Sequence, residues 1–188
     1  MRETRWHSGE RAFPLTEQQE IRADAVDRDF DGFYRDEFRG VVGLAYALSG
    51  SRSGAEDMAQ DAFLAAHRSW DRIGRYDQPE TWVRRVVANL AVSAFRRRIA
   101  EAKALARFAA RRQAYVVELP AEDAAFWGAV RALPRRQAQA IALHYLEDRS
   151  VADIARILDC AEGTVKAHLF KGRQALSHKL GAREEEVP

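Results

Sequence analysis

The sequence predicts an all-α protein made of two small helical domains joined by a flexible linker, the second being a four-helix unit with a helix-turn-helix. Apolar residues recur every three or four positions along most of residues 30–180, which is the period of a helix with one buried face. Stretches rich in glycine, serine or proline, at 50–54 and 74–79, interrupt that rhythm. Residues 99–121 are rich in alanine and arginine without a sustained apolar stripe, so we expect the linker there.

Length and composition limit the class of protein. The chain has 188 residues, of which 47% are hydrophobic and 31% charged, enough for one domain or two small ones, which excludes disorder throughout. The formal net charge is only +2, but acidic residues crowd the first third and basic residues the middle, which indicates two kinds of partner. Cys160 has no second cysteine to pair with, and no apolar run approaches the ~20 residues of a membrane span. We therefore expect a cytoplasmic protein without membrane insertion.

Two helices are expected at the start of the first domain, after a polar tail (residues 1–28) to which we assign no function. The first follows the apolar rhythm from Phe30 to Leu48 and ends at the loop 50–54. Ser53, three residues before Glu56, predicts a capping box that opens the second. Its buried side should carry Met58, Ala62, Phe63, Ala66 and Trp70. Its opposite side is polar, with Glu56, Asp57, Gln60, Asp61 and His67.

A third helix, starting after residues 74–79 and closing the first domain at residue 98, combines an apolar stripe with a basic face. The stripe consists of Trp82, Val83, Val86, Val87, Leu90, Ala94 and Phe95. The basic face carries Arg84, Arg85, Arg96, Arg97 and Arg98 together with Asn89 and Ser93. Such a face suits a nucleic-acid backbone, with amide and hydroxyl groups to reach bases. A solvated cationic face is the alternative interpretation.

The second domain is expected over residues 122–181, followed by a short tail (182–188). Its first helix carries Phe126, Trp127, Val130 and Leu133, and Pro134 starts the next. Ser150 and Asp153 predict a capping box for a third helix that ends at Leu158. A turn over residues 159–161 then leads to the last helix, which completes a helix-turn-helix.

The last helix has an inward and an outward face at helical spacing. The inward residues are Val165, Leu169, Gly172 and Leu176, and the outward residues are Gly163, Lys166, Ala167, Phe170, Lys171 and Gln174. Lysines can contact phosphates or guanine edges, and Phe170 can contact thymine methyl groups. The outward face therefore suits a DNA major groove, although an ordinary solvated helical hairpin is the simpler alternative.

Three segments in this order resemble a bacterial RNA polymerase sigma factor of the extracytoplasmic-function (ECF) group. They are residues 55–64 (AEDMAQDAFL), residues 81–91 (TWVRRVVANLA) with Arg96 to Arg98 after them, and residues 133–175, which begin LPRRQ. The resemblance covers residues 30–180. It implies a protein that binds core RNA polymerase and directs promoter-specific transcription initiation, with sigma region 2 at 29–98 and sigma region 4 at 122–181.

The resemblance implies partners and roles for matching positions. The partners are core RNA polymerase, through the coiled coil of its largest subunit and the flap, and promoter DNA. The polymerase-binding residues would be Glu56, Asp57, Gln60 and Asp61. Paired carboxylates can also perform acid–base catalysis, but no histidine, metal-ligand spacing or phosphate-binding loop accompanies them. We therefore expect no enzyme activity, no cofactor and no metal.

Two DNA elements would be read by different domains. Region 2 would capture the melted −10 strand, with a base rotated into a pocket, through Arg75, Tyr76, Asp77, Arg85, Asn89, Arg96 and Arg97. Region 4 would read the −35 element as duplex. Lys166, Ala167, Phe170 and Lys171 would lie at base edges, and Arg149, Thr164 and Arg173 nearer phosphates.

A further partner and a location also follow from the resemblance. Members of the group are commonly held inactive by an anti-sigma factor, which we expect as a further partner, and the protein would be nucleoid-associated when bound to polymerase. Cys160 suits packing better than redox sensing. A one-component helix-turn-helix regulator is the main alternative, and a nucleic-acid-modifying enzyme ranks last because we find no catalytic cluster in the sequence.

Overall fold

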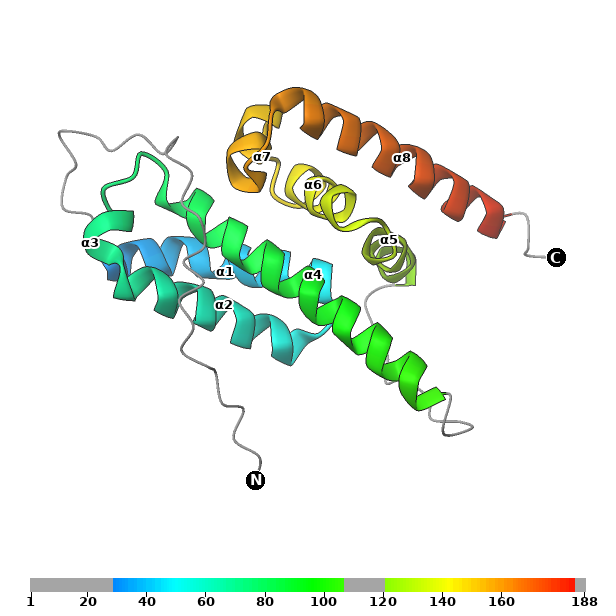
Figure 1. Cartoon of the computed structure of the whole chain (residues 1–188), viewed down its shortest axis with the longest axis horizontal. Helices are drawn as coiled ribbons and strands as arrows, with labels where there is room; N and C mark the ends of the chain where they lie inside the picture. The colour runs from blue at the N-terminus through cyan, green and yellow to red at the C-terminus, as the bar shows by residue number, and fades with distance from the viewer. Residues whose placement is uncertain (1–28, 107–120, 185–188) are drawn as a thin grey trace.

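The computed structural model describes residues 29–106 and 121–184, and these ranges contain eight α-helices. The first range holds α1 (Phe30–Ser49), α2 (Arg52–Arg68), α3 (Trp70–Ile73) and α4 (Pro79–Ala106). The second holds α5 (Ala121–Arg131), α6 (Arg135–Tyr145), α7 (Val151–Leu158) and α8 (Glu162–Glu184). Figure 1 shows α1, α2 and α4 packed together as one bundle, with α5 to α8 on the side of α1 and α4. Among these described helices, none is both long and apolar enough to cross a membrane.

Aromatic packing joins α1, α2 and α3 at one end of the first unit. The ring of Phe33 has its centroid 5.7 Å from that of Phe63 and 4.9 Å from that of Trp70. Tyr34 meets Phe63 edge to face at 5.0 Å. Phe63 is 2% exposed, and burying a side chain of this kind stabilises the fold by about 1.5–3 kcal/mol. The expected inner face of α2 is confirmed, with Trp70 placed just beyond it in α3.

The connection between α1 and α2 is shorter than expected, and its cap is different. Gly50 ends α1 with a left-handed backbone (φ 68°) and donates its N–H to the carbonyl of Tyr46. Ser51, in extended backbone, caps α2 by accepting the N–H of Gly54 at 3.3 Å. The prediction that Ser53 is the cap was therefore wrong, because Ser51 already satisfies the first turn and Ser53 lies inside the helix.

Helix α4 continues to Ala106, so residues 99–106 are helical and not part of a linker. The stretch from Arg96 to Ala102 is exposed, which explains the absence of an apolar stripe in the sequence. Alanine, arginine, lysine and glutamate have high helix propensity, and extending an existing helix needs no new nucleation. Of the rest of the expected linker, residues 107–120 lie outside the described residues, as do residues 1–28, and Ala121 is the first residue of α5.

The helix-turn-helix forms as predicted. Ser150 and Asp153 make the reciprocal capping box at the start of α7, and Asp159 ends that helix in left-handed backbone. Helix α8 packs its inner face onto α5, α6 and α7, with Val165, Leu169, Gly172 and Leu176 all buried. A Cβ atom at Gly172 would lie 2.9 Å from Cγ1 of Ile141, so only glycine allows α6 and α8 to approach this closely.

Candidate nucleic-acid interface

The outer face of α8 is open to solvent. Its exposed residues are Gly163, Thr164, Lys166, Ala167, Phe170, Lys171, Arg173 and Gln174. Phe170 is 67% exposed, which is unusual for so large an apolar side chain in a helix whose other face is well packed. The inner and outer faces therefore divide as the sequence predicted, and the outer face combines cations with an aromatic ring that can contact DNA.

Two polar residues near this face are less accessible than its lysines. Arg149 is half-buried, and its Nε lies 3.5 Å from a carboxylate oxygen of Glu147. His168 is also half-buried, and burial together with the positive charges of Arg136 and Lys171 lowers its pKa below the ordinary histidine value. His168 is therefore mostly neutral at pH 7, which favours a packing role over a charge contact with phosphate.

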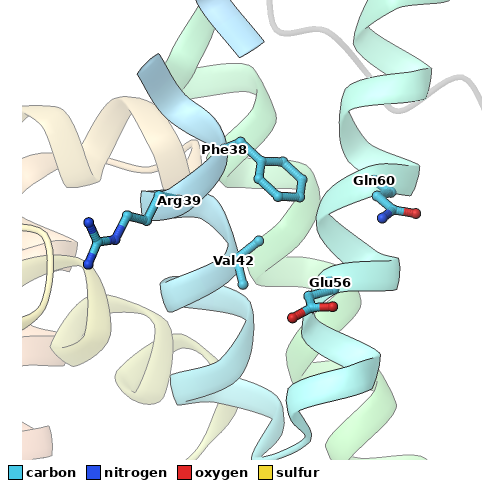
Figure 2. A pocket seen from close by; sticks show the side chains of 5 residues that line it. All are labelled: Phe38, Arg39, Val42, Glu56 and Gln60. Carbon is cyan, nitrogen blue, oxygen red and sulfur yellow. The ribbon is translucent and has the colours of Figure 1, made fainter. Parts of the chain in front are cut away.

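The acidic face of α2 is exposed and borders a pocket shared with α1. Glu56, Asp57, Gln60 and Asp61 are all exposed. Figure 2 shows Glu56 and Gln60 of α2 across from side chains of α1. The α1 residues that line this pocket are Phe38, Arg39 and Val42. Sequence reasoning missed the α1 contribution, because Phe38 and Val42 belong to the apolar rhythm that was assigned wholly to the core.

The residues expected to contact the −10 strand fall into three groups by exposure. Arg75, Asp77, Arg96 and Arg97 are exposed. Tyr76 is only 6% exposed and belongs to the hydrophobic core, so it is not available to stack on a base in this conformation. Arg85 and Asn89, the third group, lie under the second unit of the protein.

Arg85 and Asn89 both contact the helix-turn-helix half. Arg85 donates through Nε to the carbonyl of Ile157 at 2.9 Å and through Nη2 to the carbonyl of Arg156 at 2.6 Å. These are last-turn carbonyls of α7, which have no partner within that helix. The Oδ1 atom of Asn89 accepts from Nη2 of Arg135 and, at 3.0 Å, from Nε2 of Gln139. Part of the basic face of α4 is thus occupied by protein.

Arg84 was expected on the basic face but is buried between the two halves. It is 4% exposed, and its guanidinium pairs with Glu37 of α1 at 2.7 Å and with Glu147 at 2.5 Å. Burial acts to lower the pKa of Arg84, but the two carboxylates outweigh burial and the pKa is raised above the ordinary arginine value. Sequence periodicity could not reveal this, because Glu147 lies 63 positions away.

Cys160, in the turn of the helix-turn-helix, is half-buried. Burial raises the pKa of its thiol, an effect that the nearby Arg136 only partly offsets. A raised pKa means little thiolate at neutral pH and therefore low reactivity toward oxidants.

Comparison with known proteins identifies the family. Two family descriptions match the sequence: "Sigma-70 region 2" over residues 33–101 and "Sigma-70, region 4" over residues 123–176. The chain is 34% identical over 156 residues to the ECF RNA polymerase sigma factor SigM of Mycobacterium tuberculosis, covering 81% of this chain and 77% of that protein. This chain belongs to the ECF sigma factors of bacterial RNA polymerase. It is also 28% identical over 179 residues to the ECF sigma factor SigW of Bacillus subtilis, covering 86% and 90%.

Solved structures agree with this family. The sigma factor RpoE of Bartonella quintana, crystallised with the anti-sigma factor NepR, matches with a TM-score of 0.63 and 25% identity, covering 81% of this chain and 97% of RpoE. The resemblance and the two-domain all-α fold predicted from the sequence are confirmed. As an ECF sigma factor, the protein binds core RNA polymerase and promoter DNA and directs transcription initiation. The one-component regulator does not account for the region 2 match.

Proposed function

We propose that this ECF sigma factor reads the −35 element as duplex through the outer face of α8. The observation that carries the proposal is the exposed row of Lys166, Phe170 and Lys171 above a fully packed inner face. Lysines at successive turns can contact guanine edges or phosphates, and the Phe170 ring can contact thymine methyl groups. Thr164 and Arg173, also exposed, flank this row and would contact phosphates, and Arg149 would join them once freed from Glu147.

In the same proposal, α4 and the loop before it capture the melted −10 strand. Arg75, Asp77, Arg96 and Arg97 offer exposed polar and cationic groups, and Arg85 and Asn89 lie on α4 between them in sequence. Cations along a strand backbone and polar groups at the bases are what single-strand capture requires. Tyr76 would take part only after a local rearrangement that exposes it.

The acidic face of α2 is proposed as the contact with the largest polymerase subunit. Four exposed polar side chains on one helix, beside a pocket lined by Phe38 and Val42, combine charge with apolar surface. We propose residues 29–98 as the unit that binds core polymerase and the −10 element, and residues 122–181 as the helix-turn-helix unit that binds the −35 element. The protein would act without catalysis of its own, in the cytoplasm and on the nucleoid when bound to polymerase.

An anti-sigma factor is proposed as a further partner. Support comes from the similar RpoE of Bartonella quintana, which was crystallised with the anti-sigma factor NepR. A protein that covers the surfaces of α2 and α4 would block polymerase binding and promoter reading together.

The test is run-off transcription with core polymerase on a library of promoter fragments, with sequencing of the 5′ ends of the products. We expect start sites at a fixed distance from a shared two-part motif only when the protein is added. Asp57→Asn should reduce these starts, whereas Glu101→Gln, which neutralises an exposed acid on α4 away from the docking face, should not. Equal activity of the two variants would reject the assigned docking face.

A further inference from the structure

We infer that the free sigma factor rests in a closed form in which region 4 covers the part of the −10-reading surface formed by Arg85 and Asn89 and leaves the −35-reading surface exposed. This inference rests on the assignment of the two DNA surfaces proposed above. Figure 1 shows α6 and α7 lying along α4, with α8 farther from α4. The contacts between the halves involve α4 with α6 and α7, and α1 with α5 and α6.

The hydrogen bonds across the interface occupy groups that single-strand capture would use. Arg85 is held by the carbonyls of Ile157 and Arg156, and Asn89 by Arg135 and Gln139. Gln139 is completely buried and also donates to the carbonyl of Ala88 at 3.0 Å. While these bonds persist, the polar atoms of Arg85 and Asn89 that would contact a base are occupied by α6 and α7.

The ionic contact at the centre of the interface is suited to reversible opening. Arg84 pairs with Glu147 across the interface, and the side chains of both are at most 6% exposed. Each also has a partner in its own half, since Arg84 pairs with Glu37 and Glu147 lies 3.5 Å from Arg149. Removing one partner of a buried pair usually leaves an uncompensated charge, which is strongly unfavourable. Here separation of the halves breaks one contact without leaving either charge alone.

The closed form affects the two DNA surfaces unequally. The outer face of α8, including Lys166 and Phe170, does not contribute to the interface and stays exposed. The free protein should therefore bind −35 duplex without opening but bind the −10 strand with full affinity only in its open form, in which Arg85 and Asn89 are released. When only a fraction of the protein is in the open form that binds the −10 strand, the apparent affinity equals the affinity of the open form multiplied by that fraction. A tenfold excess of the closed form therefore weakens −10 binding about tenfold.

The distance between the two halves tests the inference directly. In the full chain with Cys160→Ser, spin labels on Arg68→Cys of α2 and Ser177→Cys of α8, both exposed sites, report the separation by pulsed electron paramagnetic resonance. We expect one narrow distance distribution. Glu147→Gln should shift it to longer and broader distances, and Asp148→Asn, at the exposed neighbouring residue, should leave it unchanged.

Binding measurements complete the test. Probes are a labelled single strand and a labelled duplex carrying the −10 and −35 sequences found by run-off transcription. Glu147→Gln should raise single-strand affinity about tenfold. It should not lower duplex affinity, because it frees Arg149, a proposed phosphate contact, from its carboxylate partner. Arg135→Ala, which removes a half-exposed partner of Asn89, should act in the same direction and serves if Glu147→Gln does not fold by circular dichroism.

Several results would overturn the closed form. They are a broad distance distribution in the parent protein, an unchanged distribution in folded variants, or opening without any gain in single-strand affinity. The distance measurement uses neither DNA nor polymerase. Absence of motif-dependent starts in run-off transcription would instead reject the proposed DNA surfaces, so the two failures can be told apart.

Discussion

Gly172 shows how one residue determines the position of the recognition helix. Its missing side chain allows α8 to approach Ile141 of α6, and a Cβ atom there would come within 2.9 Å of that residue. Because α8 presents Lys166 and Phe170 from its opposite face, any displacement at Gly172 also changes how those side chains are presented. The sequence predicted that Gly172 faces inward but could not reveal its neighbour, since helix contacts between distant segments are not encoded in periodicity.

Gly172→Ala should destabilise the fold by about 1–3 kcal/mol, because the added methyl group overpacks the contact between α6 and α8. Urea unfolding followed by circular dichroism measures this. Gly128→Ala is the matched control, since nothing lies within 4 Å of the added Cβ in the exposed face of α5. The control should be neutral or slightly stabilising, because alanine has the higher helix propensity. Equal destabilisation by both substitutions would contradict the packing argument.

Asp153 links the stability of the helix-turn-helix to pH. Hydrogen bonds from Ser150, with a smaller contribution from Arg156, lower the pKa of the Asp153 carboxyl below its ordinary range. A carboxyl whose folded pKa is depressed stabilises the fold above its unfolded pKa and loses that contribution as pH falls through the folded pKa. Asp153→Asn should therefore lower stability at pH 7, and its difference from the parent should shrink under acidic conditions below the ordinary carboxyl range. Unfolding curves across pH measure the difference, and one that is constant with pH would exclude the charge-assisted cap.

At the scale of elements, α8 was the most predictable and α4 the least. Helix α8 has one inner and one outer face in a small unit, so helical period alone separates Val165 and Leu169 from Lys166 and Phe170. Helix α4 contacts α1 and α2 on one side and α6 and α7 on another, so a polar residue such as Arg84 is buried by a second neighbour. Helix α6 carries a sign of the same second neighbour. Its residues from Ala138 to Leu143 are buried on every side of the helix, as expected for a helix enclosed on several sides.

Phe170→Ala in α8 should weaken DNA binding without much change in the stability of the fold. The ring is mostly exposed, so the free energy of unfolding should change by less than about 0.5 kcal/mol. Loss of a base contact should weaken binding to the −35 duplex by about 1–3 kcal/mol. Fluorescence anisotropy with a labelled duplex measures this, and Lys179→Ala, at an exposed site near the end of α8, is the control. A loss of stability without a loss of binding would assign Phe170 to packing.

At the scale of the whole molecule, the two units are separate in sequence but joined by specific contacts. The family and the order of its two units could be predicted from three segments, because these resemble the corresponding segments of known sigma factors. The interface between the units could not, because it depends on pairs such as Arg84 with Glu147 and Asn89 with Arg135 that no local pattern connects. The interface also changes the interpretation of the basic face of α4, because part of that face contacts the second unit of the protein in the free chain.

The central claim is that α4 and α8 read different parts of one promoter. Its most direct test is the motif recovered by 5′-end sequencing from a randomised promoter library transcribed with core polymerase and either the parent, Asn89→Ala or Lys166→Ala. We expect Lys166→Ala to relax base preference only in the upstream part of the motif, and Asn89→Ala only in the part next to the start site. Motifs that are identical for all three proteins, or that change in the opposite parts, would contradict the account.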